Sequence, residues 1–519
     1  MLKCKINGKE MEVPQGTSII EAFKLSGQDI AHYCWHPGLS VAGVCRLCMV
    51  EIEGQPKLQI ACNTMVQDGM VINNNSETVK DVVRWGLDFH LINHPLDCPI
   101  CDQAGECGLQ DQYMQFGKYD PEMAERKVKK RKVVDLGPTV VLDSERCILC
   151  SRCVRFTDEV SKTHELGIFN RGDRSEIGTF KDRPLDNKYS LNTVDICPVG
   201  ALTSKDFRFR QRVWYLKTAE SICPGCSTGC NVNVYYNEEG LWRVRPRHNP
   251  EVNGHWMCDE GRDTYKYVNR KARLLEAKMG HRDNWTLESP GAAAKAAGQK
   301  LREVIEAHGP ESVALVLTGQ YTTEELETAV QKFKGDLGSS LVYHWVNNPE
   351  SFEDFDGILL RGDKNPNTKG LLKILEQEGV SLTWKDLESR VQQGQIKTVV
   401  VAGPENQSVF PDFVEKVNLL AGVENVVWLT ACPHSVLDSR EKATWQIPLK
   451  TYIEKAGSFI NHQGKTQSFE VGTVIVSSAL TLAEAATLLV GQELEVSSGD
   501  RLAELTRKKN FFTETRGAL

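Results

Sequence analysis

Short runs of alternating apolar and polar residues open the chain and predict strands. Residues 2–6 (LKCKI) and 9–13 (KEMEV) have the period of two that places alternate side chains on opposite faces of a sheet. The Asn-Gly pair at residues 7–8 is typical of a tight hairpin turn. Residues 17–27 (TSIIEAFKLSG) then predict a helix. This order of strand, turn, strand and helix indicates a small α+β domain at the N-terminus.

A different pattern follows residue 270, where short apolar runs alternate with helical segments. Residues 312–317 (SVALVL), 355–362 (FDGILLRG) and 396–403 (IKTVVVAG) predict strands, and residues 323–333 (TEELETAVQKF) predict a helix. Strands that alternate with helices are typical of parallel α/β structure. We therefore expect a multidomain chain with α+β structure first and α/β structure last.

No segment has the length and apolar character of a membrane span. The most apolar run, residues 471–490, contains Glu484 and several Ser and Thr residues, and it predicts a strand followed by a helix. The first residues (MLKCKINGKEMEVPQG) contain no apolar signal core. We expect a cytoplasmic protein with no direct membrane span.

Composition narrows the class of protein only slightly. With 519 residues the chain is long enough for several domains. Hydrophobic residues make up 40% and charged residues 25%, which is ordinary for a globular protein, and the net charge of −7 gives no basis for nucleic-acid binding. A basic run at residues 127–132 is expected to be a solvated linker rather than a docking patch for an acidic partner.

The position of the cysteines is more informative than their number. Sixteen of the seventeen cysteines precede residue 259, and many are separated by two residues. In a reducing cytosol, repeated C-x2-C steps favour metal ligation over disulfides. The cysteines fall into four candidate ligand sets along the chain.

The first ligand set is Cys34, Cys45, Cys48 and Cys62, with the spacing C-x10-C-x2-C-x13-C. Plant-type ferredoxins hold a [2Fe–2S] cluster with C-x4-C-x2-C and a distant fourth cysteine, and this chain keeps the C-x2-C step while lengthening the first loop. The preceding order of elements is what a β-grasp ferredoxin domain shows. Zinc is the alternative metal, although zinc sites usually combine two short C-x2-4-C motifs. Cys4 is expected to be a buried apolar residue.

The second ligand set is His94, Cys98, Cys101 and Cys107, with the spacing H-x3-C-x2-C-x5-C. Three cysteines cannot complete the four-ligand site of a [4Fe–4S] cluster, so a nearby imidazole is the expected fourth donor. His90 is the alternative, because helical spacing could place it on the same face as His94. We prefer His94, which is nearer to the cysteines in sequence. A histidine ligand should raise the reduction potential, because it makes the site less negative.

The third ligand set opens with Cys147, Cys150 and Cys153 and closes with Cys197 in the segment CPVG. Bacterial ferredoxins combine C-x2-C-x2-C with a remote Cys-Pro. Because no second C-x2-C-x2-C precedes it, Cys197 is expected to complete this same [4Fe–4S] site. Structural zinc is the alternative here too.

The fourth ligand set is Cys223, Cys226, Cys230 and Cys258, with the spacing C-x2-C-x3-C-x27-C. The intervening residues 231–248 alternate as a β-hairpin would, which should fold Cys258 back beside the other three. Zinc is more credible here than in the other sets, since cysteines from two separated segments can form a structural zinc site.

Some motifs are missing from the sequence. No G-x-G-x-x-G follows a strand and no G-x-x-x-x-G-K-[ST] occurs. We expect no NADH oxidation, no ATP hydrolysis and no catalytic residue in this chain alone. Several clusters in one chain indicate electron conduction instead. Cys432 has no cysteine neighbour and is expected to be structural.

The ligand motifs resemble those of the large iron–sulfur subunit of bacterial respiratory complex I, the proton-pumping NADH:quinone oxidoreductase. The resemblance rests on CWHPGLSVAGVCRLCMVEI, HPLDCPICDQAGECGLQD and RCILCSRCVRF with DICPVGAL, and it runs from end to end. The fourth set is similar to the N-terminal cluster domain of molybdopterin oxidoreductases. Residues 280–519 look like a shortened molybdopterin-oxidoreductase domain, with no molybdopterin expected.

The ligand sets and the resemblance together predict five domains. They are a [2Fe–2S] ferredoxin-type domain (1–78), a [4Fe–4S] domain with one histidine and three cysteine ligands (79–120), a ferredoxin-like [4Fe–4S] domain with the basic linker (121–215), a molybdopterin-oxidoreductase-type [4Fe–4S] domain (216–275) and a degenerate molybdopterin-oxidoreductase-like α/β domain (276–519).

The resemblance also implies a function. Electrons would enter from a flavin- and NADH-binding subunit, pass through one [2Fe–2S] and then [4Fe–4S] clusters, and leave toward quinone through other iron–sulfur subunits of the peripheral arm. The fourth cluster would lie off this path. The resemblance places the chain at the cytoplasmic side of the bacterial inner membrane.

Two other functions use a similar cluster-binding half. A catalytic formate dehydrogenase would need a much longer molybdenum domain with a cysteine or selenocysteine on the metal, for which only Cys432 is available. An iron-only hydrogenase would need several further cysteines after Cys258, and they are absent from the sequence. The electron-input subunit of an NAD-linked hydrogenase usually stops before the C-terminal region. A zinc-stabilised scaffold without a redox role is a third alternative.

Overall fold

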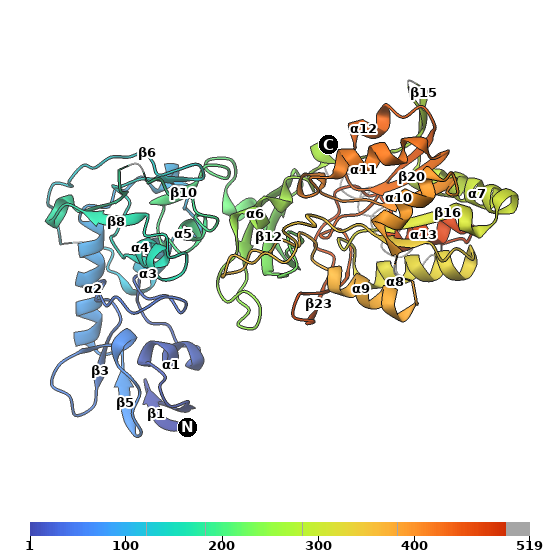
Figure 1. The fold of residues 1–519 in the computed structure, drawn as a ribbon. Coiled ribbons are helices and arrows are strands. Elements are labelled where there is room, and N and C mark those ends of the chain that lie inside the picture. Colours follow the sequence, from blue (N-terminus) through green and yellow to red (C-terminus); the bar gives the residue numbers. More distant parts are fainter. Residues whose placement is uncertain (121, 182, 283, 381, 495–519) are drawn as a thin grey trace, which may run out of the picture. The chain divides into compact units, whose positions relative to one another are not determined.

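The computed structural model describes residues 1–120, 122–181, 183–282, 284–380 and 382–494. The chain divides into two compact units (Figure 1). Unit 1 comprises Met1–Ala219, Cys230–Asp263 and Asp356–Leu360. Unit 2 comprises Glu220–Gly229, Thr264–Phe355 and the described residues from Arg361 onward. The candidate ligands are concentrated in unit 1.

Unit 1 begins with a five-stranded sheet in the order β2-β1-β5-β3-β4. Strands β1 and β2 form an antiparallel hairpin, while β5 pairs parallel to β1. The hairpin turn places Asn7 and Gly8 at φ 47° and 85°, which the Asn-Gly pair tolerates. The predicted β-grasp order is thus confirmed, with β1 (Leu2–Ile6), β2 (Lys9–Val13), α1 (Ile19–Ser26), β3 (Met49–Ile52), β4 (Gln59–Ile60) and β5 (Met70–Asn73).

Helix α1 closes one face of this sheet. Ser18 and Glu21 form a capping box at its start, and Gly27 ends it in the left-handed conformation. Its apolar face, which includes Ile20 and Phe23, packs into one buried cluster with side chains of the sheet. Burial of this kind, at roughly 25 cal/mol per Å² of apolar surface, holds the small domain together.

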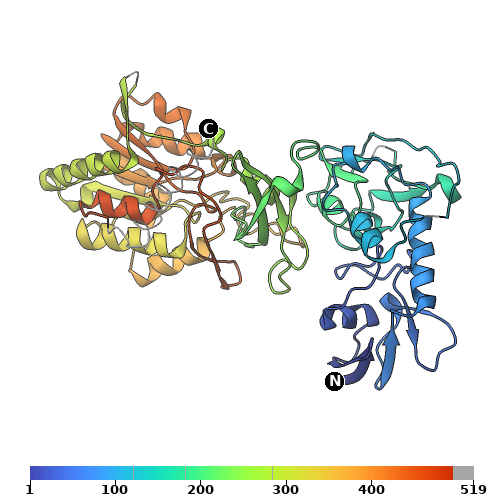
Figure 2. The ribbon, with the colours of Figure 1, turned by 180° about the vertical axis from the view of Figure 1, so that it is seen from behind.

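The rest of unit 1 consists of short elements joined by long loops that carry the candidate ligands. Helix α2 leads away from β5, as both views of the ribbon show (Figures 1 and 2). Small antiparallel sheets follow, and β12 and β13 confirm the hairpin predicted in residues 231–248. The elements are α2 (Glu77–Leu91), α3 (Gly108–Phe116), β6 (Val134–Asp135), β7 (Val140–Leu142), α4 (Arg152–Glu159), β8 (Leu166–Phe169), β9 (Glu176–Thr179), α5 (Asn192–Asp195), β10 (Leu202–Ser204), β12 (Asn231–Asn237), β13 (Gly240–Pro246) and α6 (Asp259–Arg262), with β11 (Lys217–Ile222) at the boundary between units.

Unit 2 is built on an eight-stranded sheet in the order β15-β14-β21-β20-β19-β16-β17-β18. The six strands from β21 to β18 in this order pair parallel to one another, and β14 and β15 add an antiparallel edge. The parallel α/β prediction is therefore confirmed. The strands are β14 (Ala277–His281), β15 (Asn284–Glu288), β16 (Val313–Leu317), β17 (Val342–His344), β18 (Leu382–Thr383), β19 (Thr398–Ala402), β20 (Asn425–Thr430) and β21 (Ala443–Pro448).

Helices cover both faces of this sheet (Figure 2). Along β16, Leu315 and Leu317 join one buried cluster, while Ala314 and Val316 join the other, as the strand period of two requires. The first face packs against α7 (Pro290–His308), α8 (Thr323–Gln331), α9 (Thr368–Gln377) and α13 (Leu482–Leu489). The second face packs against α10 (Trp384–Gln392), α11 (Phe413–Leu419) and α12 (Ser435–Asp438). A separate hairpin joins β22 (Gly457–Ile460) and β23 (Thr466–Phe469).

Two strand predictions were wrong. Residues 355–362 form a turn, because the Asp356 carboxylate accepts hydrogen bonds from the backbone N–H groups of Ile358, Leu359 and Leu360. An Asp side chain that binds nearby backbone donors competes with strand pairing. Residues 471–480 contain no strand, and only the helical part of that prediction, α13, is confirmed. No helix in the described parts of the chain is both long and apolar enough to cross a bilayer.

Candidate metal centres

The first ligand set lies in the loops around β3 and β4 of the β-grasp sheet. All four thiols are buried, with exposed fractions of 1–7%. They approach one another in two pairs. A hydrogen bond from Cys45 lowers the pKa of Cys34 to about 5, and Cys48 lowers the pKa of Cys62 in the same way. Two pairs of cysteines are the donor set that a [2Fe–2S] cluster needs, with two thiolates for each iron.

Strained backbone supports the loops of the first and third sets. Arg46, between Cys45 and Cys48, has φ 55°, and Leu149 and Ser151, on either side of Cys150, have φ 54° and 61°. Residues other than glycine seldom adopt this left-handed conformation, and such strain concentrates at functional sites. The turns point neighbouring cysteines toward one space.

The second ligand set surrounds a pocket in unit 1. His94, Cys98, Cys101 and Cys107 all line it, together with Leu109 and other side chains. The His94 ring is buried, and its Nδ1 atom has no hydrogen-bond partner among the described residues. Burial lowers the pKa of His94 to about 4, so the ring is neutral near pH 7 and available as a metal ligand.

His90, the alternative donor, lies elsewhere. It is within α2, where its Nδ1 atom is 2.6 Å from the Gly86 carbonyl oxygen. Its ring packs edge-on against Tyr33 at a centroid distance of 5.0 Å, and the Tyr33 N–H donates to Cys45 Sγ. His90 therefore lies beside the first ligand set, and the structure favours His94 for the second.

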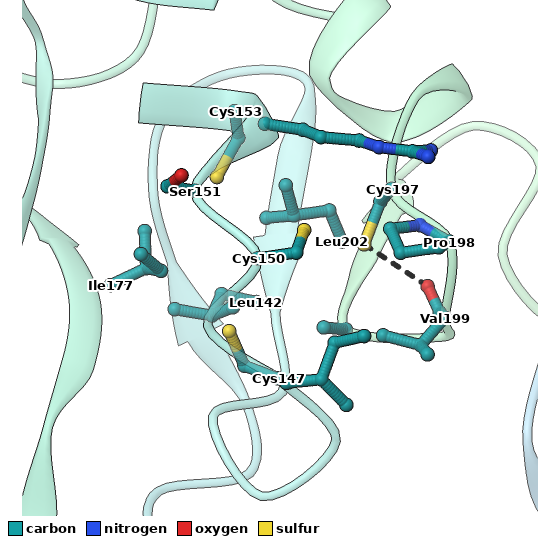
Figure 3. A pocket seen from close by; sticks show the side chains of 13 residues that line it. Leu142, Cys147, Cys150, Ser151, Cys153, Ile177, Cys197, Pro198, Val199 and Leu202 are labelled. Atoms are coloured by element: carbon teal, nitrogen blue, oxygen red, sulfur yellow. Dashed lines mark hydrogen bonds between the residues drawn. The ribbon is translucent and has the colours of Figure 1, made fainter. Parts of the chain in front are cut away.

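The third ligand set lines an apolar pocket (Figure 3). Burial raises the pKa of Cys147 to about 12 and that of Cys150 to about 11, and it also raises the pKa values of Cys153 and Cys197. Cys197 Sγ donates to the Val199 carbonyl oxygen at 3.1 Å. Four thiols that are neutral in this apolar setting become ligands only as thiolates, which a bound metal stabilises.

Gly200 lines the second-set pocket although it lies three residues after Cys197 of the third set. The cysteine spacing did not predict this role. Cys197, Pro198 and Val199 line the third-set pocket, whereas Gly200 lines the second-set pocket. A Cβ atom at Gly200 would lie 2.4 Å from Cys101 Sγ. Only glycine permits this close approach. A glycine directly after Cys-Pro-Val was the available sequence signal.

The fourth ligand set is divided between the two units. Cys223 and Cys226 belong to unit 2, and Cys230 and Cys258 belong to unit 1. All four are buried, with exposed fractions of 4–5%. Within unit 1, the chain after β13 returns to the start of β12, where the Asn231 N–H donates to Asn253 Oδ1 at 3.0 Å. Because the cysteines belong to different units, this set stays a prediction.

No group of three or more His, Cys, Asp or Glu side chains in the described ranges is arranged as a ready shell for a single metal ion. The first three sets stay predictions, supported by contacts between thiols in the first set and by the lining of one pocket in each of the second and third. Those observations fit iron–sulfur clusters, whose thiolates are spread over several irons.

Residues outside the sets also have defined places. Cys4 is buried in β1, and Cys432 Sγ lies 3.6 Å from the Tyr267 carbonyl oxygen. The basic run is not simply solvated, because Lys127 Nζ donates to the carbonyl oxygen of Leu91 at 2.7 Å and Lys132 pairs with Glu145 at 2.6 Å. Its charges satisfy carbonyl and carboxylate groups of this chain.

Four family models match successive segments of the chain. They are a 2Fe-2S iron-sulfur cluster binding domain (residues 1–77), the NADH-ubiquinone oxidoreductase-G iron-sulfur binding region (86–121), the ferredoxin-like domain of NADH-quinone oxidoreductase subunit 3 (137–203) and a molybdopterin oxidoreductase Fe4S4 domain (216–270). The chain resembles the G subunit of NADH-quinone oxidoreductases. It contains both 2Fe-2S and 4Fe-4S binding domains.

Curated relatives support the same resemblance. The NADH-quinone oxidoreductase G subunit of Rickettsia felis is 36% identical over 355 residues, which cover 66% of this chain and 50% of the relative. The corresponding G subunit of Streptomyces coelicolor is 41% identical over 52% of this chain and 32% of the relative. The chain thus spans half or less of the length of these relatives. A solved NAD+-reducing [NiFe]-hydrogenase matches 41% of this chain and 91% of its own, with 30% identity and a TM-score of 0.38.

Proposed function

We propose that the chain is an iron–sulfur electron-transfer subunit of an NADH:quinone oxidoreductase. In the assembled complex it would carry electrons from a flavin- and NADH-binding subunit toward quinone, coupled to proton translocation. The observation that carries this proposal is the third-set pocket, where four cysteines from two distant segments line one apolar space. The order of the four matching family models supports the same function.

The proposed cofactors are one [2Fe–2S] and three [4Fe–4S] clusters, and no molybdopterin. When bound, such clusters accept and release single electrons at potentials tuned by ligand type, hydrogen bonds and exposure. The ligands would be Cys34, Cys45, Cys48 and Cys62 for the [2Fe–2S] cluster, and His94, Cys98, Cys101 and Cys107, then Cys147, Cys150, Cys153 and Cys197, then Cys223, Cys226, Cys230 and Cys258 for the [4Fe–4S] clusters.

The protein's own residues would orient and protect these groups. Leu142, Ile177 and Leu202 keep water from the third-set thiols. The neutral His94 ring lines the second-set pocket, and its Nδ1 atom, which has no hydrogen-bond partner among the described residues, could bind metal without releasing a proton. We expect no substrate chemistry from this chain alone, so substrates would react on partner subunits.

We also propose domain boundaries, partner subunits and a cellular location for the chain. The five domains would have the boundaries 1–78, 79–120, 121–215, 216–275 and 276–519. Partners would be the flavin- and NADH-binding subunit and other iron–sulfur subunits of a peripheral arm at the cytoplasmic side of the bacterial inner membrane.

Metal analysis and electron paramagnetic resonance (EPR) test this function. The full chain, purified without oxygen, should contain about fourteen irons and acid-labile sulfide, given one two-iron and three four-iron clusters. Reduction by dithionite should give a [2Fe–2S] signal that is distinct from those of the cubane clusters. Zinc in place of iron, or no signal after reduction, would overturn the proposal.

A further inference from the structure

One face of helix α4 holds the ligand loop of the first set. The helix contains Cys153 of the third set, and Arg152, Arg155 and Glu159 follow one another at spacings of three and four residues. Side chains at these spacings share a face of a helix. All three contact residues 34–40, the loop that begins with the first ligand of the first set.

Arg155 contacts a ligand residue of each set. Its Nη2 atom donates to the carbonyl oxygen of Cys34 and, at 3.4 Å, to that of Cys150. Its Nη1 atom donates to the Ser40 carbonyl oxygen, and its Nε atom donates to Ser151 Oγ at 3.3 Å. The planar guanidinium, with five donors, can serve several acceptors at once, which an ammonium group cannot do with the same geometry.

Arg152 makes a second connection between the same segments. Its Nη2 atom donates to the Trp35 carbonyl oxygen at 2.6 Å, and its Nη1 atom donates to the Ile196 carbonyl oxygen at 3.1 Å. Trp35 directly follows Cys34, and Ile196 directly precedes Cys197. The two arginines thus link both segments that carry the third set to the start of the first set.

Glu159 fastens the other end of the loop. The Ser40 N–H donates to Glu159 Oε2 at 2.8 Å, and Ser40 Oγ donates to Oε1. Residues 34–40 are therefore held at both ends by one helix. None of these contacts involves a cysteine Sγ atom, so they are made by groups other than the candidate ligand atoms.

The charge of the arginines reaches the thiols of both sets. Arg152 interacts electrostatically with Cys150, Cys197 and Cys34, and Arg155 interacts with Cys34 and Cys150. A guanidinium stays protonated at any ordinary pH. A fixed positive charge favours the more negative, reduced form of a nearby redox centre. Both arginines are half-buried, so solvent and salt screen part of this effect.

We propose that Arg152 and Arg155 are positioning residues that join the first and third ligand sets. They hold the loop at residues 34–40 on helix α4 and raise the reduction potentials of the centres on both sides. This inference rests on the proposed function, since it assumes that both sets bind clusters. According to this proposal, the two ligand sets are connected by Arg152 and Arg155, neither of which is a ligand.

The test uses the full chain with its clusters, three arginine variants, and Glu159→Gln as a fourth variant for hydrogen exchange. Arg155→Gln removes the charge, Arg155→Lys keeps the charge but loses the planar fork, and Arg174→Gln removes an exposed charge elsewhere in unit 1. EPR-monitored redox titration measures the potentials of the [2Fe–2S] centre and the third-set centre. Amide hydrogen exchange measures how firmly residues 34–40 are held, with or without clusters.

Arg155→Gln should shift both potentials to lower values and speed up exchange in residues 34–40. Arg155→Lys should leave the potentials close to those of the wild type but still speed up exchange, and Arg174→Gln should change neither. Unchanged potentials in Arg155→Gln, or a shift of one centre alone, would overturn the proposal.

The two possible failures are distinguishable. If the wild-type chain shows no cluster signals, the proposed function fails, whereas the exchange experiment still tests the contact in the chain itself. If Arg155→Gln does not assemble clusters, hydrogen exchange in Arg155→Lys and Glu159→Gln tests the proposal instead. Both should speed up exchange in residues 34–40, and wild-type exchange in both would overturn the proposal.

Discussion

The second and third ligand sets lie in the same unit but differ in what surrounds their donors. The third-set pocket is lined mainly by apolar side chains and by four thiols whose pKa values burial raises, with Ser151 and Arg152 at its lining as well. Beside the second set, Asp97 pairs with Arg146 at 2.8 Å and with Lys132 at 3.3 Å. The comparison shows two ways to place cluster ligands, one by apolar packing and backbone turns, the other by ionic contacts that hold a loop.

This difference has a consequence for substitutions. The third-set pocket should depend on each sulfur, since the four cysteines are the only thiols in its lining. A pocket that depends on its supporting loop should also respond to residues that never touch the metal. The following variants test this contrast, beginning with the largest expected effect.

Cys150→Ala should abolish the third-set cluster. The substitution removes one of the four thiols that line the pocket and leaves no further thiol to replace it. The chain should therefore lose about four irons and the corresponding EPR signal. Iron analysis and EPR of the purified chain measure the loss. Cys4→Ala is the matched control, because Cys4 is also buried but lies in β1, and it should keep all the iron. Full iron content in Cys150→Ala would remove Cys150 from the ligand set.

Gly200→Ala should destabilise unit 1 and weaken the second-set cluster. The new Cβ atom would lie 2.4 Å from Cys101 Sγ and 3.0 Å from the Gln103 Cβ atom, so the Cys101 side chain or the Gly200 segment must shift. Overpacking of this kind costs about 1–3 kcal/mol. Denaturant unfolding and the second-set EPR signal measure the effect. Gly291→Ala, where the nearest atom to the new Cβ would be 4.0 Å away, should cause no loss. Equal behaviour of the two variants would contradict the close approach at Gly200.

Arg146→Gln tests the ionic support of the second set. Arg146 donates to Asp97 through Nε at 3.2 Å and Nη2 at 2.8 Å, and Asp97 directly precedes Cys98. Hydrogen bonds to charged groups contribute about 2 kcal/mol, so the free energy of unfolding should fall by about that amount. The second-set signal should broaden or weaken. Arg174→Gln, which removes an exposed charge, should leave both properties unchanged; a similar loss there would attribute the effect to net charge.

Features that depend on a local sequence motif could be predicted from the sequence. The third set followed from C-x2-C-x2-C and Cys-Pro alone, because the backbone turns at Leu149 and Ser151 are local to the motif. The β-grasp order and the parallel sheet of unit 2 also followed from local periodicity. The prediction of a strand at residues 355–362 was wrong, because the Asp356 side chain accepts hydrogen bonds from nearby backbone N–H groups. Apolar periodicity gives no sign of such hydrogen bonds.

Contacts between segments distant in sequence could not be predicted in this way. Arg155 and Cys34 are 121 residues apart, and Gly200 and Cys101 lie on different loops. The spacing of Arg152, Arg155 and Glu159 indicated one helix face, but nothing in the sequence identified the loop that this face contacts. Such contacts depend on how the loops fold over one another.

His94→Cys should have the smallest effect on assembly and the most specific effect on potential. A thiolate can replace the imidazole as fourth donor, so the iron content should stay the same. Because a thiolate is negative where His94 is neutral, the reduced form becomes less favourable and the second-set potential should fall. EPR-monitored titration measures this shift. His90→Gln is the control, since His90 packs against Tyr33 beside the first set and should leave the second-set potential unchanged. An unchanged potential in His94→Cys together with a shift in His90→Gln would assign the ligand to His90.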